Sequence, residues 1–597
     1  MATSTTGPAT MGTHGAAYGT GFTTRPVIMG TYGVVAAGHY LAAEAGFRML
    51  ERGGNAVDAG VAAGFALNVL EPQSNGIGGE VPILVYSAAQ GRPFAVNGQG
   101  WAPKGATIGW FKKEGIEVIP GDGFLPATVP GAFGSWATAL MCFGRLSLKE
   151  VLTPAIDLTE SGFPVYPGLV GSIAGLAEKF VEWWPTSAAV YLPDGEPPKA
   201  GTLFRNRDWA ETFKRVVDVE IRERHRGREV AIQAAIDYFY KGEPAKRMVA
   251  FTRDHAFVDA SGKAHYGLFT IEDFAAYQTK VEDPLRVTYR GYEVYKCNTW
   301  CQGPVFLQQL TLLEGYDLAA MEHNSPEYIH TVIEASKLAF ADRETYYGDP
   351  DFVDVPLDRL LSKAYAAERR TLMDPDRASL ELRPGDTPPS VIKRREGDPN
   401  AYVGDTTHLD VVDREGNMMS ATPSGGWIPS SPVVEGLGFP LGTRGQMFSL
   451  DPDHPNALMP WKRPRATLTP SLVTVEGKPF MVFGTPGGDC QDQWTLQFFL
   501  NFVDFEMDLQ EAIDAPTFHS EHFPSSFYPR AAYPGKMVVE GRIPEEVRAA
   551  LQAKGHTVEV TGNWANGKVL AVKLDRENGV IAGAASPRHM LAYVVGR

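Results

Sequence analysis

Residues 404–422 read GDTTHLDVVDREGNMMSAT, and this stretch decides the fold. It contains two runs of strand-like composition, 406–413 and 418–422, separated by a turn at 414–417. Two such runs joined by a short turn with glycine predict a β-hairpin. The residues before it, 375–404, are rich in Pro, Arg and Asp and poor in apolar side chains. That composition predicts an exposed, unstructured linker or surface arm.

A threonine at the point where such an arm enters a strand has a specific chemical use. If the peptide bond between Asp405 and Thr406 is cut, Thr406 gains a free α-amino group beside its own hydroxyl. An α-amine has a pKa of about 8, so it can act as the base that makes the neighbouring Oγ1 a nucleophile. Gly487 and Gly488 lie between a predicted strand and a predicted helix and can present two backbone N–H groups as an oxyanion hole. Each feature alone is common in ordinary strands and turns, so the hypothesis depends on a wider pattern.

The rest of the chain predicts an α+β layered architecture. Residues 39–52 have helical spacing and stop at Gly53-Gly54, and residues 56–70 form an almost wholly apolar helix that must be buried on all sides. Residues 326–346 predict a long amphipathic helix that begins at a proline. Further strands are predicted at residues 289–295, 471–475 and 480–484, and a helix at 493–503.

Composition excludes several classes of function. The chain has 597 residues and a net charge of -15, without a Lys/Arg block, which argues against nucleic acid and anionic membranes as partners. No apolar run is long enough to span a bilayer. Residues 1–25 are small and polar, lack the features of a signal peptide, and predict a flexible tail on a cytoplasmic protein.

No motif indicates a metal or an organic cofactor. The four cysteines do not form a disulfide framework, and Cys297 and Cys301 are interpreted as buried thiols. His519 and His522 lack a third ligand and are interpreted as surface or structural histidines. Asp342 and Glu344 are interpreted as part of a solvated helix face.

The wider pattern is present as an ordered set of short motifs. The chain resembles the gamma-glutamyltransferase family of N-terminal nucleophile hydrolases from about residue 28 to the C-terminus. The matching stretches include Gly53-Gly54-Asn55-Ala56-Val57-Asp58-Ala59, Gly76-Ile77-Gly78-Gly79, Tyr289-Arg290-Gly291-Tyr292, Thr406-Thr407-His408, Lys462-Arg463-Pro464, Thr469-Pro470-Ser471 and Pro486-Gly487-Gly488.

The resemblance implies a four-layer αββα sandwich and a precursor that cuts itself between Asp405 and Thr406. The products would be a large chain, residues 26–405, and a small chain, residues 406–597. The large chain would follow the flexible tail 1–25 and would end in the arm 375–405. In the family the new N-terminal threonine attacks a γ-glutamyl amide, and water or an amine then takes the acyl group. Ser424 aligns with the hydroxyl residue that supports this nucleophile. By analogy, processed pairs would form a homodimer.

The groups that hold the glutamate in this family are replaced here. Gln99 stands where the family has an arginine before an Ala-Pro pair, Gly426 beside Trp427 replaces an asparagine, and no acidic residue follows Gln446-Met447. A Ser-Ser pair becomes Ala466-Thr467. Because a bidentate arginine–carboxylate contact contributes strongly to binding, its loss predicts a different, small or less polar amide substrate. Candidates for a rebuilt acyl pocket are Trp101, Trp427, Arg444 and Arg465, each equally compatible with a structural role.

Two other functions stay open at this point. One is a true γ-glutamyl hydrolase or transpeptidase acting on glutathione-like donors. The other is a catalytically inactive relative that binds or scaffolds, against which the retention of Thr406, Ser424, Gly487 and Gly488 argues.

Overall fold

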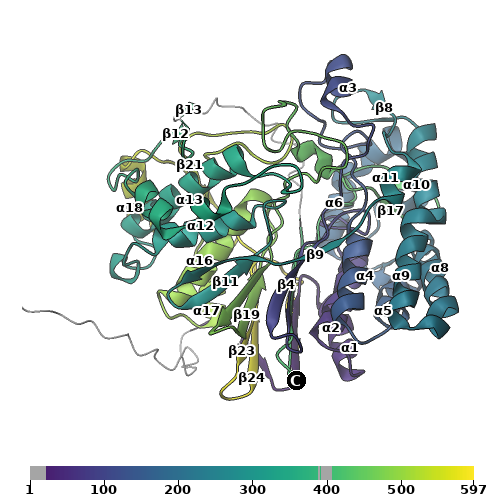
Figure 1. Cartoon of the computed structure of the whole chain (residues 1–597), viewed down its shortest axis with the longest axis horizontal. Helices are drawn as coiled ribbons and strands as arrows, with labels where there is room; N and C mark the ends of the chain where they lie inside the picture. Colours follow the sequence, from purple (N-terminus) through teal and green to yellow (C-terminus); the bar gives the residue numbers. More distant parts are fainter. Residues whose placement is uncertain (1–21, 388–389, 392–405) are drawn as a thin grey trace, which may run out of the picture.

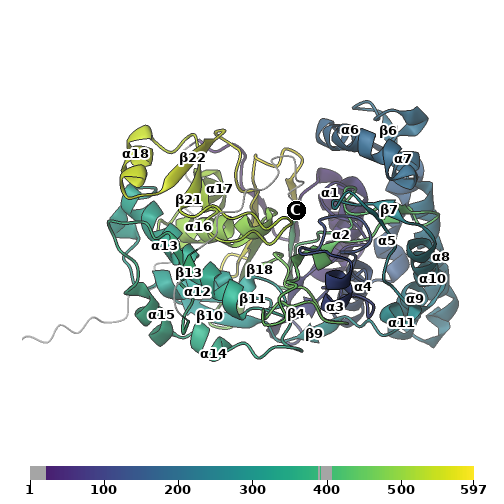
Figure 2. The same ribbon diagram turned by 90° about the horizontal axis from the view of Figure 1, so that it is seen from above.

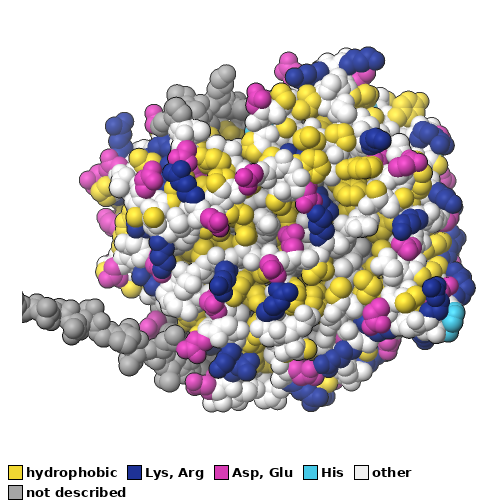
Figure 3. Space-filling model, in the orientation of Figure 1, with side chains coloured by type: hydrophobic (Ala, Val, Ile, Leu, Met, Phe, Trp, Pro, Cys, Tyr) yellow, Lys and Arg dark blue, Asp and Glu magenta, His cyan; other side chains and the backbone are white. Residues whose placement is uncertain are grey.

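Two seven-stranded antiparallel sheets face each other, and helices cover the outer face of each (Figures 1 and 2). The computed structural model describes residues 22–387, 390–391 and 406–597. The predicted α+β class and four-layer αββα sandwich are confirmed. Among the described residues, no helix is both long and apolar enough to cross a membrane. Figure 3 shows acidic and basic side chains interspersed on one face of the molecule, without a continuous basic area.

The hairpin of the opening stretch lies in the middle of one sheet. β14 (Leu409–Asp413) pairs with β15 (Met418–Ala421) and, on its other side, with β2 (Gly33–Ala37). The sheet order is β25-β2-β14-β15-β3-β4-β9. The remaining strands are β25 (Tyr593–Gly596), β3 (Ile83–Ser87), β4 (Arg92–Asn97) and β9 (Lys280–Glu282). The predicted hairpin is therefore confirmed.

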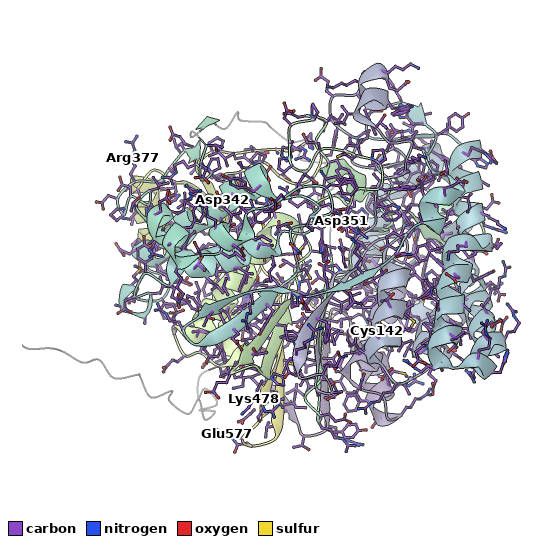
Figure 4. All side chains as sticks on the ribbon, viewed as in Figure 1. Cys142, Asp342, Asp351, Arg377, Lys478 and Glu577 are labelled. Atoms are coloured by element: carbon purple, nitrogen blue, oxygen red, sulfur yellow. The ribbon has the colours of Figure 1, made fainter. Side chains whose placement is uncertain are left out.

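The second sheet packs directly against the first and has the order β1-β24-β23-β19-β18-β11-β10. Its strands are β1 (Ile28–Gly30), β24 (Val580–Ala585), β23 (Leu570–Asp575), β19 (Lys478–Gly484), β18 (Ser471–Val475), β11 (Tyr292–Lys296) and β10 (Leu285–Tyr289). Figure 4 labels Lys478 at the lower end of the sandwich, so β19 runs from there to the opposite end at Gly484.

Helix α2 (Ala56–Leu70) confirms the prediction of a helix buried on all sides. It packs against β14 and β15 on one side and against three helices on the others, which leaves no solvent-facing stripe. The three helices are α1 (Tyr40–Glu51), α4 (Ala132–Phe143) and α5 (Leu148–Ser161). Asn55 and Asp58 form a capping box at its N-terminus, which fixes where the helix begins.

The strand predicted over residues 289–295 is interrupted by a turn: residue 289 ends β10, and residues 292–295 belong to β11. Arg290 and Gly291 between them both have positive φ, 49° and 90°. Two consecutive residues with positive φ make a tight two-residue hairpin turn. The tyrosines on either side of the turn continued the alternating pattern and concealed it.

Helix α13 (Pro326–Tyr346) has the predicted bounds, but it is not amphipathic, because both of its faces are buried. α12 (Gly303–Leu313), α18 (Glu545–Ala553) and β20 (Phe518–Ser520) pack around it. The interpretation of Asp342 and Glu344 as a solvated face is therefore wrong. Asp342, labelled in the helical layer of Figure 4, accepts hydrogen bonds from Gln308, Tyr365 and the N–H of Gly385.

Parts of the predicted arm and tail are fastened to the core. The N–H of Gly385 bonds Asp342 at 2.9 Å, and the carbonyl of Ser379 accepts from Lys337 at 2.9 Å, so the arm is not unstructured there. β12 (Glu381–Leu382) pairs with β13 (Ser390–Val391). In the tail, the Thr24 N–H and hydroxyl both bond Asp514. The predictions for residues 1–21, 388–389 and 392–405, including Asp405, lie outside the described residues.

Candidate active site

Thr406 lies at the end of the sandwich where β14 begins, three residues before that strand. Its Oγ1 is 3.0 Å from the Oγ of Ser424, which follows β15 by three residues. The two residues form an isolated antiparallel bridge, and the Thr407 N–H donates to the Pro423 carbonyl at 3.2 Å. Both Thr406 and Ser424 are buried. The hairpin thus brings together two hydroxyls that are 18 residues apart in sequence.

Glu80 lies on the other side of Ser424. The two residues exchange both backbone hydrogen bonds, at 2.9 and 3.0 Å, just before β3 begins. Gly425 has a φ of 68°, and a Cβ at this position would be 2.5 Å from the Glu80 Oε2. A side chain at residue 425 would therefore displace the Glu80 carboxylate.

Arg444 is the fourth member of this buried group, after Thr406, Ser424 and Glu80. It lies in the short 3₁₀ segment Arg444–Met447. Its Nε donates to Glu80 Oε1 at 2.6 Å, and its Nη2 donates to Ser424 Oγ at 2.8 Å. The guanidinium carbon lies 5.1 Å from the ring centre of Trp427 and 5.7 Å from that of Phe527. Trp427, Phe527 and Met447 form a small buried apolar cluster around this cation.

Burial dominates the electrostatics of this pair. It raises the pKa of the Glu80 carboxyl, and the Arg444 guanidinium opposes that rise. Both side chains are about 1% exposed, so water screens their interaction very little. The result is a buried charged pair whose cationic member contacts the hydroxyl next to Thr406.

Gly487 and Gly488 lie in the loop between β19 and α16 (Gln491–Val503). A Cβ at Gly484, where β19 ends, would overlap the His408 ring, so this loop leaves the sheet beside the start of β14. Gly488 faces Phe527, with 2.8 Å between a Cβ placed there and the ring, and Phe527 also covers Arg444. The φ angles of Gly487 and Gly488 are 128° and 54°. The diglycine therefore lies at the same end of the sandwich as Thr406.

Comparison with known proteins agrees with this geometry. The sequence model of the gamma-glutamyltranspeptidase family matches residues 42–595. The chain belongs to this family. The predicted resemblance is confirmed, and the chain is a hydrolase of the N-terminal nucleophile type that acts on carbon–nitrogen bonds.

Individual relatives and solved structures match nearly the whole chain. The glutathione hydrolase-like YwrD proenzyme of Bacillus subtilis is 34% identical over 575 residues, 94% of this chain and 98% of that protein. The structure of LmbA2991HD superposes with a TM-score of 0.91 at 44% identity, over 97% of this chain and 100% of that chain. The structure of the cephalosporin acylase from Bacillus halodurans superposes with a TM-score of 0.81 at 32% identity, over 98% of this chain and 99% of that chain.

Besides Arg444, two more of the predicted pocket residues, Trp427 and Gly426, lie close to Ser424 and Glu80. A Cβ at Gly426 would be 2.5 Å from the backbone nitrogen of Gly79, so the segment 424–427 crosses the glycine turn 76–79 at close range. This crossing brings Trp427 over Arg444.

The remaining predicted pocket residues have contacts elsewhere. Trp101 stacks on Trp461 and donates to the Asp273 carbonyl at 3.0 Å. Gln446 donates to the Gly121 carbonyl at 2.8 Å and accepts from the Tyr528 N–H at 3.1 Å, so its amide fastens two loops.

Gln99 and Thr467 are buried polar side chains with spare hydrogen-bonding capacity. Within the described ranges, Gln99 Oε1 and Thr467 Oγ1 have no hydrogen-bond partner. Gln99 Nε2 is 3.5 Å from the neighbouring Gly100 carbonyl oxygen. The place of both side chains in a pocket stays a prediction.

Arg465 belongs to a separate buried cluster beneath the diglycine loop. It bonds Glu344 at 2.9 Å and Ser526 at 3.2 Å, while Arg343 pairs with Asp489, the residue after Gly488. Burial lowers the pKa of Arg465 to about 10, against the opposing effect of Glu344. Burial alone would raise the pKa of Glu344, but Arg465 and Arg343 outweigh it and lower that pKa to about 2.

Two features of the site were missed from the sequence. Glu80 was not selected, although it is a lone acidic residue directly after Gly76-Ile77-Gly78-Gly79 and before an apolar strand. Lys296 and Asp492 are both fully buried and pair at 3.1 Å below the diglycine loop. Burial raises the pKa of Asp492 to about 6 although Lys296 opposes it. Neither lysine nor aspartate lies in a local pattern that predicts burial.

One group of side chains has the composition of a metal site. His330, Glu334 and His556 have ligand atoms within 4.8 Å of one another. Glu334, however, already bonds Lys337 at 2.6 Å and Arg383 at 3.1 Å. Two cations on the one carboxylate disfavour a bound metal ion. His519 and His522 are buried, and His522 Nδ1 accepts from the Gly535 N–H, so they are structural rather than surface histidines.

Proposed function

We propose that this protein is a self-processing hydrolase in which Thr406 is the nucleophile and its α-amino group the base. The observation that supports this most is the 3.0 Å contact between Thr406 Oγ1 and Ser424 Oγ inside a buried group at the start of the central hairpin. A hydroxyl pair of this kind suits a nucleophile with a supporting neighbour. The relative from Bacillus subtilis is named a proenzyme, which supports a precursor here.

Maturation would proceed by an N-to-O acyl shift. Thr406 Oγ1 attacks the carbonyl carbon of Asp405, the C–N bond breaks, and the hydroxyl proton ends on the Thr406 nitrogen. Water then hydrolyses the resulting ester, which restores the hydroxyl and leaves a carboxylate on Asp405. The balance is one water consumed for one peptide bond, with residues 406–597 as the small chain.

Turnover would repeat the same chemistry on an external amide. The α-amine takes the Oγ1 proton as Oγ1 attacks the substrate carbonyl, and it returns that proton to the leaving amine. Backbone N–H groups of Gly487 and Gly488 would stabilise the negative oxygen of the tetrahedral intermediate. Water, or an amine, then takes the acyl group from Thr406.

The proposed substrate is a small amide rather than a γ-glutamyl compound. Two nitrogens of Arg444 contact Glu80, one of them also donates to Ser424, and the guanidinium lies near the rings of Trp427 and Phe527. Because Arg444 is already engaged by these groups, it does not replace the missing arginine as an anchor for an α-carboxylate, which supports a substrate without that charged head. Gln446 is occupied with backbone partners, so it does not replace the missing ammonium anchor.

The second candidate is hydrolysis of γ-glutamyl compounds, and the name of the YwrD relative favours it. Turnover of a chromogenic γ-glutamyl anilide at about 1–10³ per second would support this candidate against the small-amide proposal. Turnover several orders of magnitude slower supports the small-amide proposal.

Thr406→Ala tests the nucleophile, with Thr407→Ala as the matched control, because both threonines are buried neighbours. Denaturing electrophoresis of the wild type should show two chains, and Thr406→Ala should show only the uncut one. Thr407→Ala should still be cut. If Thr406→Ala is processed and active, the proposed function is wrong, and an uncut, inactive wild type would favour the scaffold alternative. The homodimer stays a prediction, which light scattering can measure.

A further inference from the structure

We propose that Glu80 and Arg444 form a charged positioning pair that holds Ser424 and adjusts the basicity of the Thr406 α-amine in opposite directions. This inference rests on the proposed function, because it assigns a role toward the same nucleophile. Neither residue would react with substrate in this role. Both would act through Ser424 and through their charges.

The pair is rigid, and this rigidity supports a positioning role. Glu80 is fixed by two backbone bonds to Ser424, and its carboxylate fits into the space left by Gly425. Arg444 is held by that carboxylate and by the rings of Trp427 and Phe527. A guanidinium with four fixed neighbours has few alternative rotamers, so its contact with Ser424 is preorganised.

The hydrogen-bond direction follows from the chemistry of arginine. A guanidinium donates and does not accept, so Ser424 Oγ must be the acceptor of the 2.8 Å bond from Arg444. The Ser424 proton therefore points away from Arg444, and Thr406 Oγ1 lies 3.0 Å from the same oxygen. Arg444 in this way restricts how the Ser424 hydroxyl can meet the nucleophile.

The two charges should affect the α-amine of Thr406 with opposite signs. A nearby cation disfavours a protonated amine and lowers its pKa, whereas a nearby anion raises it. Other titratable groups near this end of the sheet are Glu71, beside Thr407 and paired with His589, and the His408–Asp410 pair on β14. These stay in place when only Glu80 or Arg444 is changed, so a shift reports on the pair.

The test measures the pH midpoint of Thr406 acylation by 4-nitrophenyl acetate in processed enzyme, the form in which the α-amine is free. Arg444→Met should raise the midpoint by about one pH unit, because the lost cation no longer opposes protonation. Glu80→Gln should lower it by a comparable amount, because Arg444 is then uncompensated. The double variant should lie between the two.

Two further variants separate position and charge from stability. Arg444→Lys keeps the charge, so its midpoint should stay near that of the wild type, but one ammonium cannot reproduce the fixed fork, and acylation should be about 10-fold or more slower. Arg588→Met is the matched control, because Arg588 is an equally buried arginine paired with Glu540. It should lower the melting temperature and leave the midpoint unchanged.

If the midpoints of both single variants stay within about 0.2 pH unit of the wild-type midpoint, the inference is overturned and the pair is purely structural. A shift of the same sign in both variants would overturn it as well. Where Arg444→Met does not fold, Glu80→Gln and Arg444→Lys still decide the outcome. Failure of the proposed function is distinguishable, since wild type would then remain uncut or Thr406→Ala would still be acylated at the same rate.

Discussion

Arg444 and Arg465 are both buried arginines paired with a glutamate, and they differ in what their remaining donors reach. Arg444 donates to Ser424, whose oxygen is 3.0 Å from the Thr406 hydroxyl. Arg465 donates to Ser526, which bonds Asp489 in the loop after Gly488. Arg444 therefore belongs to the proposed reaction centre, whereas Arg465 fastens the loops that surround it.

The sequence alone could not separate these two arginines. Arg444 lies in a short 3₁₀ segment and Arg465 in an irregular one, and both were equally good candidates for an acyl pocket. Their glutamate partners, Glu80 and Glu344, are more than 100 residues away in the chain. Both arginines are buried and paired with a glutamate. The serine to which each also donates, Ser424 or Ser526, distinguishes the positioning arginine from the structural one.

The largest expected effect comes from removing the hydroxyl of Ser424, which Arg444 contacts. The matched control removes the hydroxyl of Ser526, which Arg465 contacts. Ser424→Ala should slow self-cleavage and acylation by about 10²–10³-fold, because the link between Arg444 and Thr406 is lost. Ser526→Ala should change those rates by less than about threefold and cost about 1 kcal/mol of stability. Rates from electrophoresis time courses decide between them. Equal effects from both serines would remove the distinction between the two clusters.

Arg465→Met should lower the free energy of unfolding by about 3 kcal/mol, because it removes one of the two buried arginines that pair with Glu344. Urea denaturation of the uncut Thr406→Ala protein, with and without the change, gives this difference in a single chain. Self-cleavage of Arg465→Met in the wild-type background should still go to completion. A shift in the pH midpoint of acylation in this variant would show that Arg465 belongs to the reaction centre.

Acid should weaken the Arg465 cluster in a defined window. The pKa of Glu344 is lowered from 4.5 to about 2 in the folded state. Its stabilising contribution, of order 2–3 kcal/mol, is therefore complete above pH 4.5 and is lost as the pH falls from there toward 2. Urea denaturation at several pH values should show a smaller acid loss in Glu344→Gln than in the parent. An identical loss in both would contradict the assigned charge state.

Trp101→Phe should give the smallest effect. The change removes the hydrogen bond to the Asp273 carbonyl and part of the stacking on Trp461, at a cost of about 1–2 kcal/mol. Acylation by 4-nitrophenyl acetate should be unchanged within about twofold. A larger change in that rate would return Trp101 to the acyl pocket and widen the reaction centre beyond Arg444.

Local patterns predicted the elements whose environment is encoded within one segment. The β14–β15 hairpin carries its own turn, and α2 is apolar on every side, so both were found with nearly correct bounds. The burial of α13 depends on β20 and α18, which lie far along the chain, and its polar residues concealed that burial. Asp342 and Glu80 were misjudged or missed for the same reason, since each finds its partner only in the folded protein.

Mass spectrometry of the purified protein after reaction with 4-nitrophenyl acetate tests the central claim most directly. We expect a small chain that begins at Thr406, ends at residue 597 and carries one acetyl group on Thr406. Hydroxylamine should release that group if it is an ester on Oγ1, whereas an amide on the α-nitrogen would survive the treatment. An active protein that remains a single chain, or an acyl group on any other residue, would contradict the assignment of Thr406 as the nucleophile.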